Sequence, residues 1–108
     1  MTGLKKRDFK FDKNSDKLFE AILSLKNIKE CELFFRDIMT ISELQAITER
    51  FTVAQDLNEG KKTYRKISEE TGVSTATITR IANWIENGKG GYKLVLNRLF
   101  GAHHHTNT

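Results

Sequence analysis

The sequence predicts an all-α protein of six helices. Apolar residues recur every three or four positions in most segments, which places them on one side of a helix. No segment shows the strict alternation of apolar and polar residues that is typical of a strand. The chain has 108 residues, with no Pro and 7 Gly, a composition that suits helices joined by short glycine turns. This length allows one domain.

Two helices are expected in the first forty residues. Ser15 can serve as the N-cap of the first helix, and Leu18 begins its apolar stripe. The second helix spans about 28–39, and its Leu33–Phe35 run leaves so little polar surface that burial on more than one side is expected. Residues 1–14 show no clear periodicity and carry several cations. We interpret them as a basic, flexible arm.

The third helix is expected to be the longest. Thr40 and Glu43 form the T-x-x-E pattern of a capping box, which announces a helix start. Apolar residues then recur to Asn58, and Gly60 ends the helix. A chain of this size buries only about two-thirds of its extended surface. Helices that are apolar nearly all round therefore predict a partner chain.

The last helix follows a flexible break at residues 86–91. Tyr92 opens a new apolar stripe that runs to Phe100. Residues 101–108 are interpreted as a disordered tail. Its histidine tract, His103–His105, is a weak metal site because adjacent residues on a frayed tail rarely converge on an ion. We predict no metal.

The segment that organises the chain is residues 63–86, which predicts two short helices around a glycine turn. Thr63 can cap the first helix and Ser74 the second. Gly72 lies between them, where the backbone needs a positive φ that only Gly adopts cheaply. The second helix carries an apolar stripe that consists of Ile78, Ile81, Ala82 and Ile85. This is the pattern of a helix-turn-helix, whose second helix lies in a DNA major groove.

The outward face of that second helix is polar and free of acidic residues until Glu86. At about 100° per residue, Ala76, Thr79, Arg80 and Asn83 point away from the side that Ile78 occupies. Small hydroxyl and methyl groups can approach base edges closely, and a helix N-terminus favours phosphate. The alternative is an αα-hairpin whose polar face only meets water.

Charge also favours nucleic acid. The formal net charge is +4 and the sequence pI is about 9.3, above the rough threshold of 9 for a nucleic-acid-binding domain. Runs of basic residues usually only face solvent, so their position in the chain decides whether they indicate nucleic-acid binding. Beside the first helix of the hairpin lie Lys61, Lys62, Arg65 and Lys66.

Several other classes of protein are not expected. Cys31 is the only cysteine, so no intrachain disulfide can form, and no run of 18 apolar residues predicts a membrane span. No nucleophile-base set, carboxylate pair or phosphate-binding loop predicts an enzyme. We expect a cytoplasmic protein without a membrane partner.

One run of the hairpin is specific enough to suggest a family. The run Ala76-Thr77-Ile78-Thr79-Arg80, together with Arg65, Glu70, Gly72 and Gly60 before it, resembles the tryptophan repressor family over about residues 15–100. Within that family it is similar to small TrpR-like proteins of the YerC/YecD type. The resemblance implies an intertwined all-helical homodimer with interlocked N-terminal helices and two helix-turn-helix heads.

The resemblance also implies a possible effector pocket. Thr40, Arg50 and Arg80 match positions that hold the family's ligand, where they would grip a carboxylate and stack on an aromatic ring. Thr40 can equally cap a helix, Arg50 can form an ion pair, and Arg80 can contact phosphate. Ile81 and Trp84 replace a Gly and a Ser of the repressor, and we hypothesise that one of them fills the ligand's space. L-tryptophan is therefore not expected as corepressor, and the effector is unknown.

Together these observations predict a homodimeric, sequence-specific transcriptional regulator, a repressor, that binds double-stranded DNA. Its heads would enter major grooves about 34–36 Å apart, a spacing known for helix-turn-helix dimers, the Trp repressor among them. Base contacts are expected from Arg65, Thr75, Ala76 and Thr79, and phosphate contacts from Lys61, Lys62, Lys66, Ser74 and Arg80. The alternatives are a helical dimeric scaffold for another protein, and a module of a replication or recombination factor.

Overall fold

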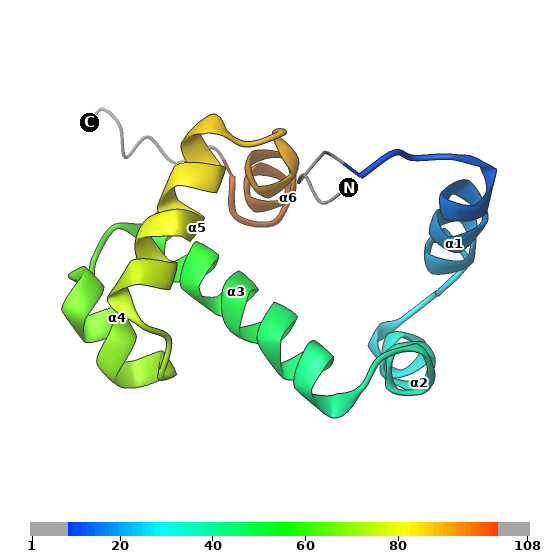
Figure 1. The fold of residues 1–108 in the computed structure, drawn as a ribbon, viewed down its shortest axis with the longest axis horizontal. Helices are drawn as coiled ribbons and strands as arrows, with labels where there is room; N and C mark the ends of the chain where they lie inside the picture. Colours follow the sequence, from blue (N-terminus) through cyan, green and yellow to red (C-terminus); the bar gives the residue numbers. More distant parts are fainter. Residues whose placement is uncertain (1–8, 102–108) are drawn as a thin grey trace, which may run out of the picture. The chain divides into compact units, whose positions relative to one another are not determined.

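The structure is a computed structural model that describes residues 9–101. These residues form six α-helices and no strand, which confirms the predicted all-α class (Figure 1). The predicted arm residues Lys5, Lys6 and Arg7 and the tract His103–His105 lie outside the described residues. The described chain divides into two compact units, the first up to Thr40 and the second from Ile41 onward.

The first unit contains α1 (Lys13–Leu23) and α2 (Ile28–Ile38). The predicted cap of α1 is wrong: Asp12, not Ser15, is the N-cap residue. The Asp12 carboxylate accepts a hydrogen bond from the Ser15 N–H at 3.0 Å, and the Ser15 hydroxyl accepts one from the Asp12 N–H at 2.8 Å. This reciprocal capping box satisfies two orphan donors at once, so the helix begins earlier than a lone Ser15 cap would place it.

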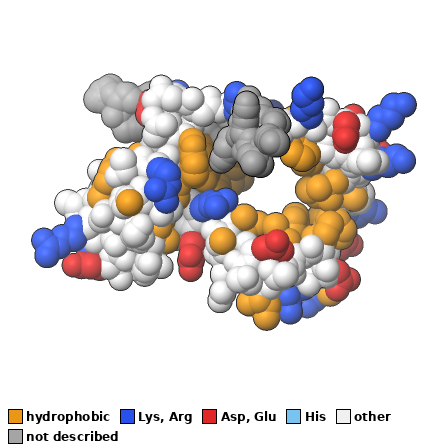
Figure 2. All heavy atoms as spheres, viewed as in Figure 1, with side chains coloured by type: hydrophobic (Ala, Val, Ile, Leu, Met, Phe, Trp, Pro, Cys, Tyr) orange, Lys and Arg blue, Asp and Glu red, His pale blue; other side chains and the backbone are white. Residues whose placement is uncertain are grey.

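Helices α1 and α2 contain no buried residue. Leu23 is 83% exposed and Ile28 is 77% exposed, and hydrophobic side chains gather at the surface over both helices (Figure 2). The sequence predicted burial of α2 on more than one side, and within this single chain that burial is absent. Large contiguous apolar surface of this kind marks an interaction site.

The second unit contains α3 (Ile41–Glu59), α4 (Tyr64–Thr71), α5 (Thr75–Asn87) and α6 (Gly91–Phe100). Helix α3 contacts all three other helices, and α4 and α5 lie beside its C-terminal half (Figure 1). The core is a single cluster to which all four helices contribute. Its buried apolar residues are Val53, Ala54, Ile67, Ile78, Ile81 and Leu96.

Only the C-terminal half of α3 reaches this core. Val53, Ala54 and Asn58 are its buried residues, whereas residues 41–50 are almost all exposed. The hairpin and α6 are therefore held on the last two to three turns of α3. Among residues 9–101, no helix combines the length and the apolar character that crossing a membrane requires.

The turn between α4 and α5 depends on Gly72, whose φ is 79°. No atom lies within 4 Å of a Cβ built at this position, so a side chain would meet no steric clash. The cost of substitution is the left-handed backbone alone, about 1–2 kcal/mol for an L-residue.

We expect Gly72→Ala to lower the free energy of unfolding by about 1–2 kcal/mol, without changing the denaturant m-value. Gly91→Ala is the matched control, because Gly91 also has open space around its Cα but lies outside the left-handed region. Urea unfolding at one fixed protein concentration measures both. Equal effects of the two variants would contradict the role given to the Gly72 backbone.

Candidate nucleic-acid interface

The predicted helix-turn-helix is present and its caps are confirmed. The Thr63 hydroxyl accepts a hydrogen bond from the Lys66 N–H at 3.0 Å, and the Ser74 hydroxyl accepts one from the Thr77 N–H at 3.1 Å. Gly72 ends α4 in the left-handed conformation, and its N–H donates to the Ser68 carbonyl at 2.9 Å. These short-range bonds determine the chain path through the turn.

The turn is further stabilised from its inner side. The Thr71 hydroxyl donates to the Ile67 carbonyl at 2.7 Å and accepts a hydrogen bond from the Val73 N–H at 3.1 Å. Val73 packs against the core of the second unit. The path of the hairpin, and with it the position of α5, is therefore determined both by hydrogen bonds within the turn and by partial burial of the Val73 side chain.

The faces of α5 are divided as predicted. Ile78 and Ile81 are completely buried. The residues expected to face outward, Thr75, Ala76, Thr79, Arg80 and Asn83, are exposed. Thr79 donates its hydroxyl proton to the Thr75 carbonyl at 3.0 Å, which leaves the oxygen free to accept a further hydrogen bond.

The N-terminal turn of α5 combines several features that favour an anion. It contains no acidic residue, and a helix N-terminus carries a partial positive charge. The Arg80 Nη2 donates to the Thr77 hydroxyl at 2.9 Å, and the Ser74 hydroxyl donates to the same oxygen at 3.1 Å. The guanidinium is thereby tied to the first turn, beside the free N–H groups.

Two predicted cations lie on the surface of α4. The Arg65 side chain is 86% exposed and its Nε lies 3.7 Å from a Glu69 carboxylate oxygen. The Lys66 Nζ lies 3.5 Å from a Glu70 oxygen. Exposed ion pairs of this kind contribute only about 0–1 kcal/mol, so a phosphate can compete for both cations.

Lys62 has a different environment. Its Nζ lies 2.6 Å from a Glu70 oxygen and 3.4 Å from an Asp56 oxygen, and only 33% of its side chain is exposed. The hydrogen bond to Glu70 is the main cause that raises the pKa of Lys62, against desolvation. The same bond is the main cause that lowers the pKa of Glu70. Lys61, the preceding residue, is exposed and has no ion pair within the described chain.

The residues assigned to an effector pocket come from several parts of the chain. Thr40 precedes α3, Arg50 lies on α3, and the other three lie on α5. Ile81 is completely buried in the core, and Arg50 and Arg80 are exposed. Arg50 lies close enough to Tyr92 to oppose the increase that burial causes in the pKa of that hydroxyl.

Trp84, the remaining member of that set, is 42% exposed. It lines a surface groove of about 910 Å³ between α5 and α6, which Arg50 and Arg80 do not line. Its other apolar lining residues are Phe51, Tyr92 and Val95. The sequence did not predict this groove, because it also requires Phe51 of α3, which is far from α5 and α6 along the chain.

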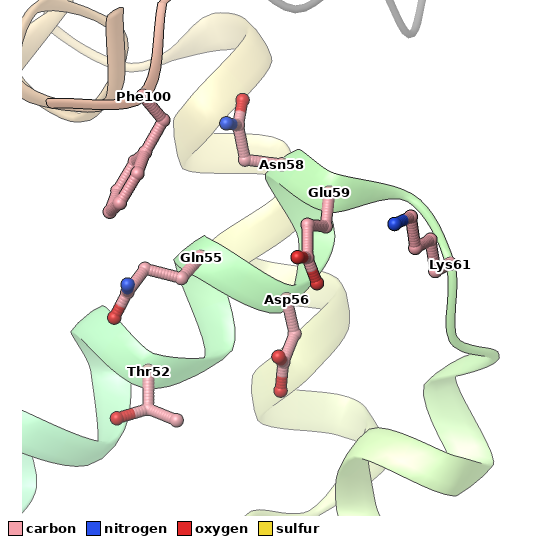
Figure 3. A pocket seen from close by; sticks show the side chains of 7 residues that line it. All are labelled: Thr52, Gln55, Asp56, Asn58, Glu59, Lys61 and Phe100. Atoms are coloured by element: carbon pink, nitrogen blue, oxygen red, sulfur yellow. The ribbon is translucent and has the colours of Figure 1, made fainter. Parts of the chain in front are cut away.

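A second cavity, of about 570 Å³, lies at the C-terminal end of α3 (Figure 3). It is polar, and Lys61, Asp56 and Glu59 line it together with Phe100. Within residues 9–101, no three His, Cys, Asp or Glu side chains are grouped in a way that could hold a metal ion.

Comparison with known proteins identifies relatives along nearly the whole described chain. The family model described as Trp repressor protein matches residues 13–100, which span both units. The uncharacterized protein YerC of Bacillus subtilis (strain 168) is 47% identical over 87 residues, which are 81% of this chain and 83% of the relative. A Trp operon repressor homolog of Vibrio campbellii (strain ATCC BAA-1116) is 31% identical over 75 residues, 69% of this chain and 75% of the relative.

The fold is also similar to that of a solved TrpR-like protein. The crystal structure of a TrpR-like protein from Eubacterium eligens ATCC 27750 matches with a TM-score of 0.77 and 44% sequence identity. The match covers 82% of this chain and 90% of that chain.

The ion pair of Glu70 predicts a pH-dependent stability. Because the pKa of Glu70 is lowered from its ordinary value of 4.5, its ionised form stabilises the fold above that pH, and the stabilisation is lost as pH falls through the folded-state pKa. We expect Glu70→Gln to lower Tm at pH 7, and the difference from the wild type to decrease as pH falls below 4.5 through the lowered pKa of Glu70.

Thermal unfolding between pH 3 and pH 8 checks this expectation. Glu69→Gln is the matched control, because the neighbouring Glu69 makes a longer ion pair, at 3.7 Å, with a more exposed cation. The control is expected to change Tm little at any pH. A loss of Tm for Glu70→Gln that is the same at pH 3 and pH 7 would show that ionisation of Glu70 does not stabilise the fold.

Proposed function

This chain belongs to the Trp repressor family, and on that premise we propose that it is a sequence-specific transcriptional repressor that acts as a homodimer. At the level of the family it is a DNA-binding regulator. The observation that carries the proposal is α5: its apolar side is buried in the core, and its exposed side is rich in hydroxyl groups and free of acidic residues in the first turn.

The contacts with DNA are assigned by chemistry and position. Thr75, Ala76 and Thr79 on the exposed side of α5, with Arg65 on α4, would face base edges in the major groove. Contacts with the phosphates of the DNA backbone would position each helix-turn-helix on the duplex without distinguishing one base sequence from another. For these phosphate contacts we propose Lys61, Lys66, Ser74 and Arg80.

A second copy of the chain is proposed to cover the apolar surface of the helices. Among residues 9–101 of a single chain, the core contains six buried apolar residues, all in the second unit. Besides the apolar residues of α1 and α2, Leu94 and Leu99 on α6 are also exposed. Intertwined dimerisation would bury these side chains, and two heads related by a two-fold axis would read a roughly palindromic site.

Selection of genomic fragments by the purified protein, followed by sequencing, tests the proposal directly. We expect enrichment of a palindromic site whose half-sites are about 34–36 Å apart. Three cationic phosphate contacts in each head predict a slope of roughly −5 for log K against log salt concentration, at about −0.9 per contact. Fragments without a shared motif, or salt-insensitive capture of a protein partner, would favour the scaffold instead.

Thr79→Ala tests the reading of bases. We expect it to reduce the preference for the selected site over its mutated versions by roughly tenfold, the usual cost of one mismatched base pair. Thr52→Ala is the control, because Thr52 makes the same bond to the carbonyl four residues earlier, at 3.0 Å, on an exposed face of α3. Quantitative gel shifts on a panel of sites measure both. A similar loss on every site would assign Thr79 to positioning.

A further inference from the structure

Helices α3 and α4 each end in a turn that carries two acidic residues. Asp56 and Glu59 lie in the last turn of α3, and Glu69 and Glu70 in the last turn of α4, and neither turn contains a basic residue. The C-terminus of a helix carries a partial negative charge, so carboxylates there are unfavourable unless a cation lies nearby.

Lys62 supplies that cation for both helices. It lies in the short connection between α3 and α4, and its ammonium reaches Glu70 at 2.6 Å and Asp56 at 3.4 Å. The Asp56 side chain is only 15% exposed, so its charge is partly removed from water and depends more on a cation than a surface carboxylate does. One side chain thereby links the end of α3 to the end of α4.

The same contacts make Lys62 a poor ligand for phosphate. Lys62, Lys66, Asp56 and Glu70 form a cluster of two cations and two carboxylates, whose net charge is zero. A phosphate that approached Lys62 would have to replace the 2.6 Å bond and would meet both carboxylates. Lys61 carries no such partner within the described chain and is exposed.

We infer that Lys62 is a positioning residue of the helix-turn-helix, which holds α4 against α3, and that Lys61 is the lysine that contacts phosphate. Ile67 of α4 packs in the same core as Ile78 and Ile81 of α5. A shift of α4 therefore changes the position of α5 as well. Lys62 acts on DNA recognition through this packing, and the inference rests on the proposed function.

The first experiment compares Lys62→Met with Lys61→Met in the full chain, by titration of the selected DNA site across a salt series. Lys61→Met is expected to weaken binding to all sequences alike and to make the salt slope less negative by about 2, one contact from each protomer. Lys62→Met is expected to reduce the preference for the selected site over scrambled DNA about tenfold, with an unchanged slope. A slope that falls for Lys62→Met and not for Lys61→Met would overturn the assignment.

Glu70→Gln separates the two roles by sequence preference. Removing the carboxylate also frees Lys66, so overall DNA affinity can rise in either case. If Lys62 contacted phosphate, the preference for the selected site over scrambled DNA would not change. Under the positioning role, Glu70→Gln reduces the preference for the selected site as Lys62→Met does. The double variant is then expected to lose less preference than the sum of the two single variants, because both single variants remove the contact between Lys62 and Glu70. Lys62→Arg keeps the charge and is expected to restore most of the preference.

A readout without DNA distinguishes failure of this inference from failure of the proposed function. The loss of Tm in the Lys62→Met/Glu70→Gln variant is expected to be smaller than the sum of the two single losses, because both single variants remove the contact between Lys62 and Glu70. If the wild type shows no sequence preference but this non-additivity holds, the proposed function is wrong and the link between α3 and α4 stands. Additive losses of Tm would refute the link, whatever the DNA measurements show.

Discussion

The position of α5 depends on one apolar core at the C-terminal half of α3. Val53 and Ala54 form the base of this core, and the inner sides of the other three helices of the second unit meet on it. Burial of apolar surface is non-directional, so the core brings the helices together without choosing their exact angles. The directional contacts around it, the caps at Thr63 and Ser74 and the left-handed Gly72, determine how the chain turns between α4 and α5.

The first unit has strong local signals without a core of its own. Asp12 and Ser15 begin α1 with a reciprocal pair of hydrogen bonds, and the Asn27 side chain caps α2 by accepting from the Glu30 N–H at 2.9 Å. Capping selects where a helix begins, but most helical stability in proteins comes from tertiary packing. No residue of α1 or α2 is buried within the described chain, so these caps are not accompanied by a core.

Electrostatics divides the basic residues beside the hairpin into two groups. Arg65, Lys66 and Arg80 make contacts that solvent screens, and those contacts cost little to exchange for a phosphate. Lys62 instead offsets the negative ends of two helices and a carboxylate that is partly removed from water. Lys61 and Lys62 are adjacent and of the same residue type, but of the two only Lys62 forms ion pairs within the described chain, and formal charge alone would not separate them.

The features that depend on residues close together along the chain could be predicted from the sequence. The helical periodicity, the caps at Thr63 and Ser74, the turn at Gly72 and the exposed side of α5 were all predictable, because each depends on neighbours within about four positions. Ser15 shows the limit of that reasoning, since a competing cap at Asp12 lay within the same span. The contacts of Lys62 with Asp56 and Glu70 and the groove beside Trp84 emerged only from the packing of the helices. These features depend on how separate helices pack. The spacing of residues along the chain does not give the distance between side chains on different helices.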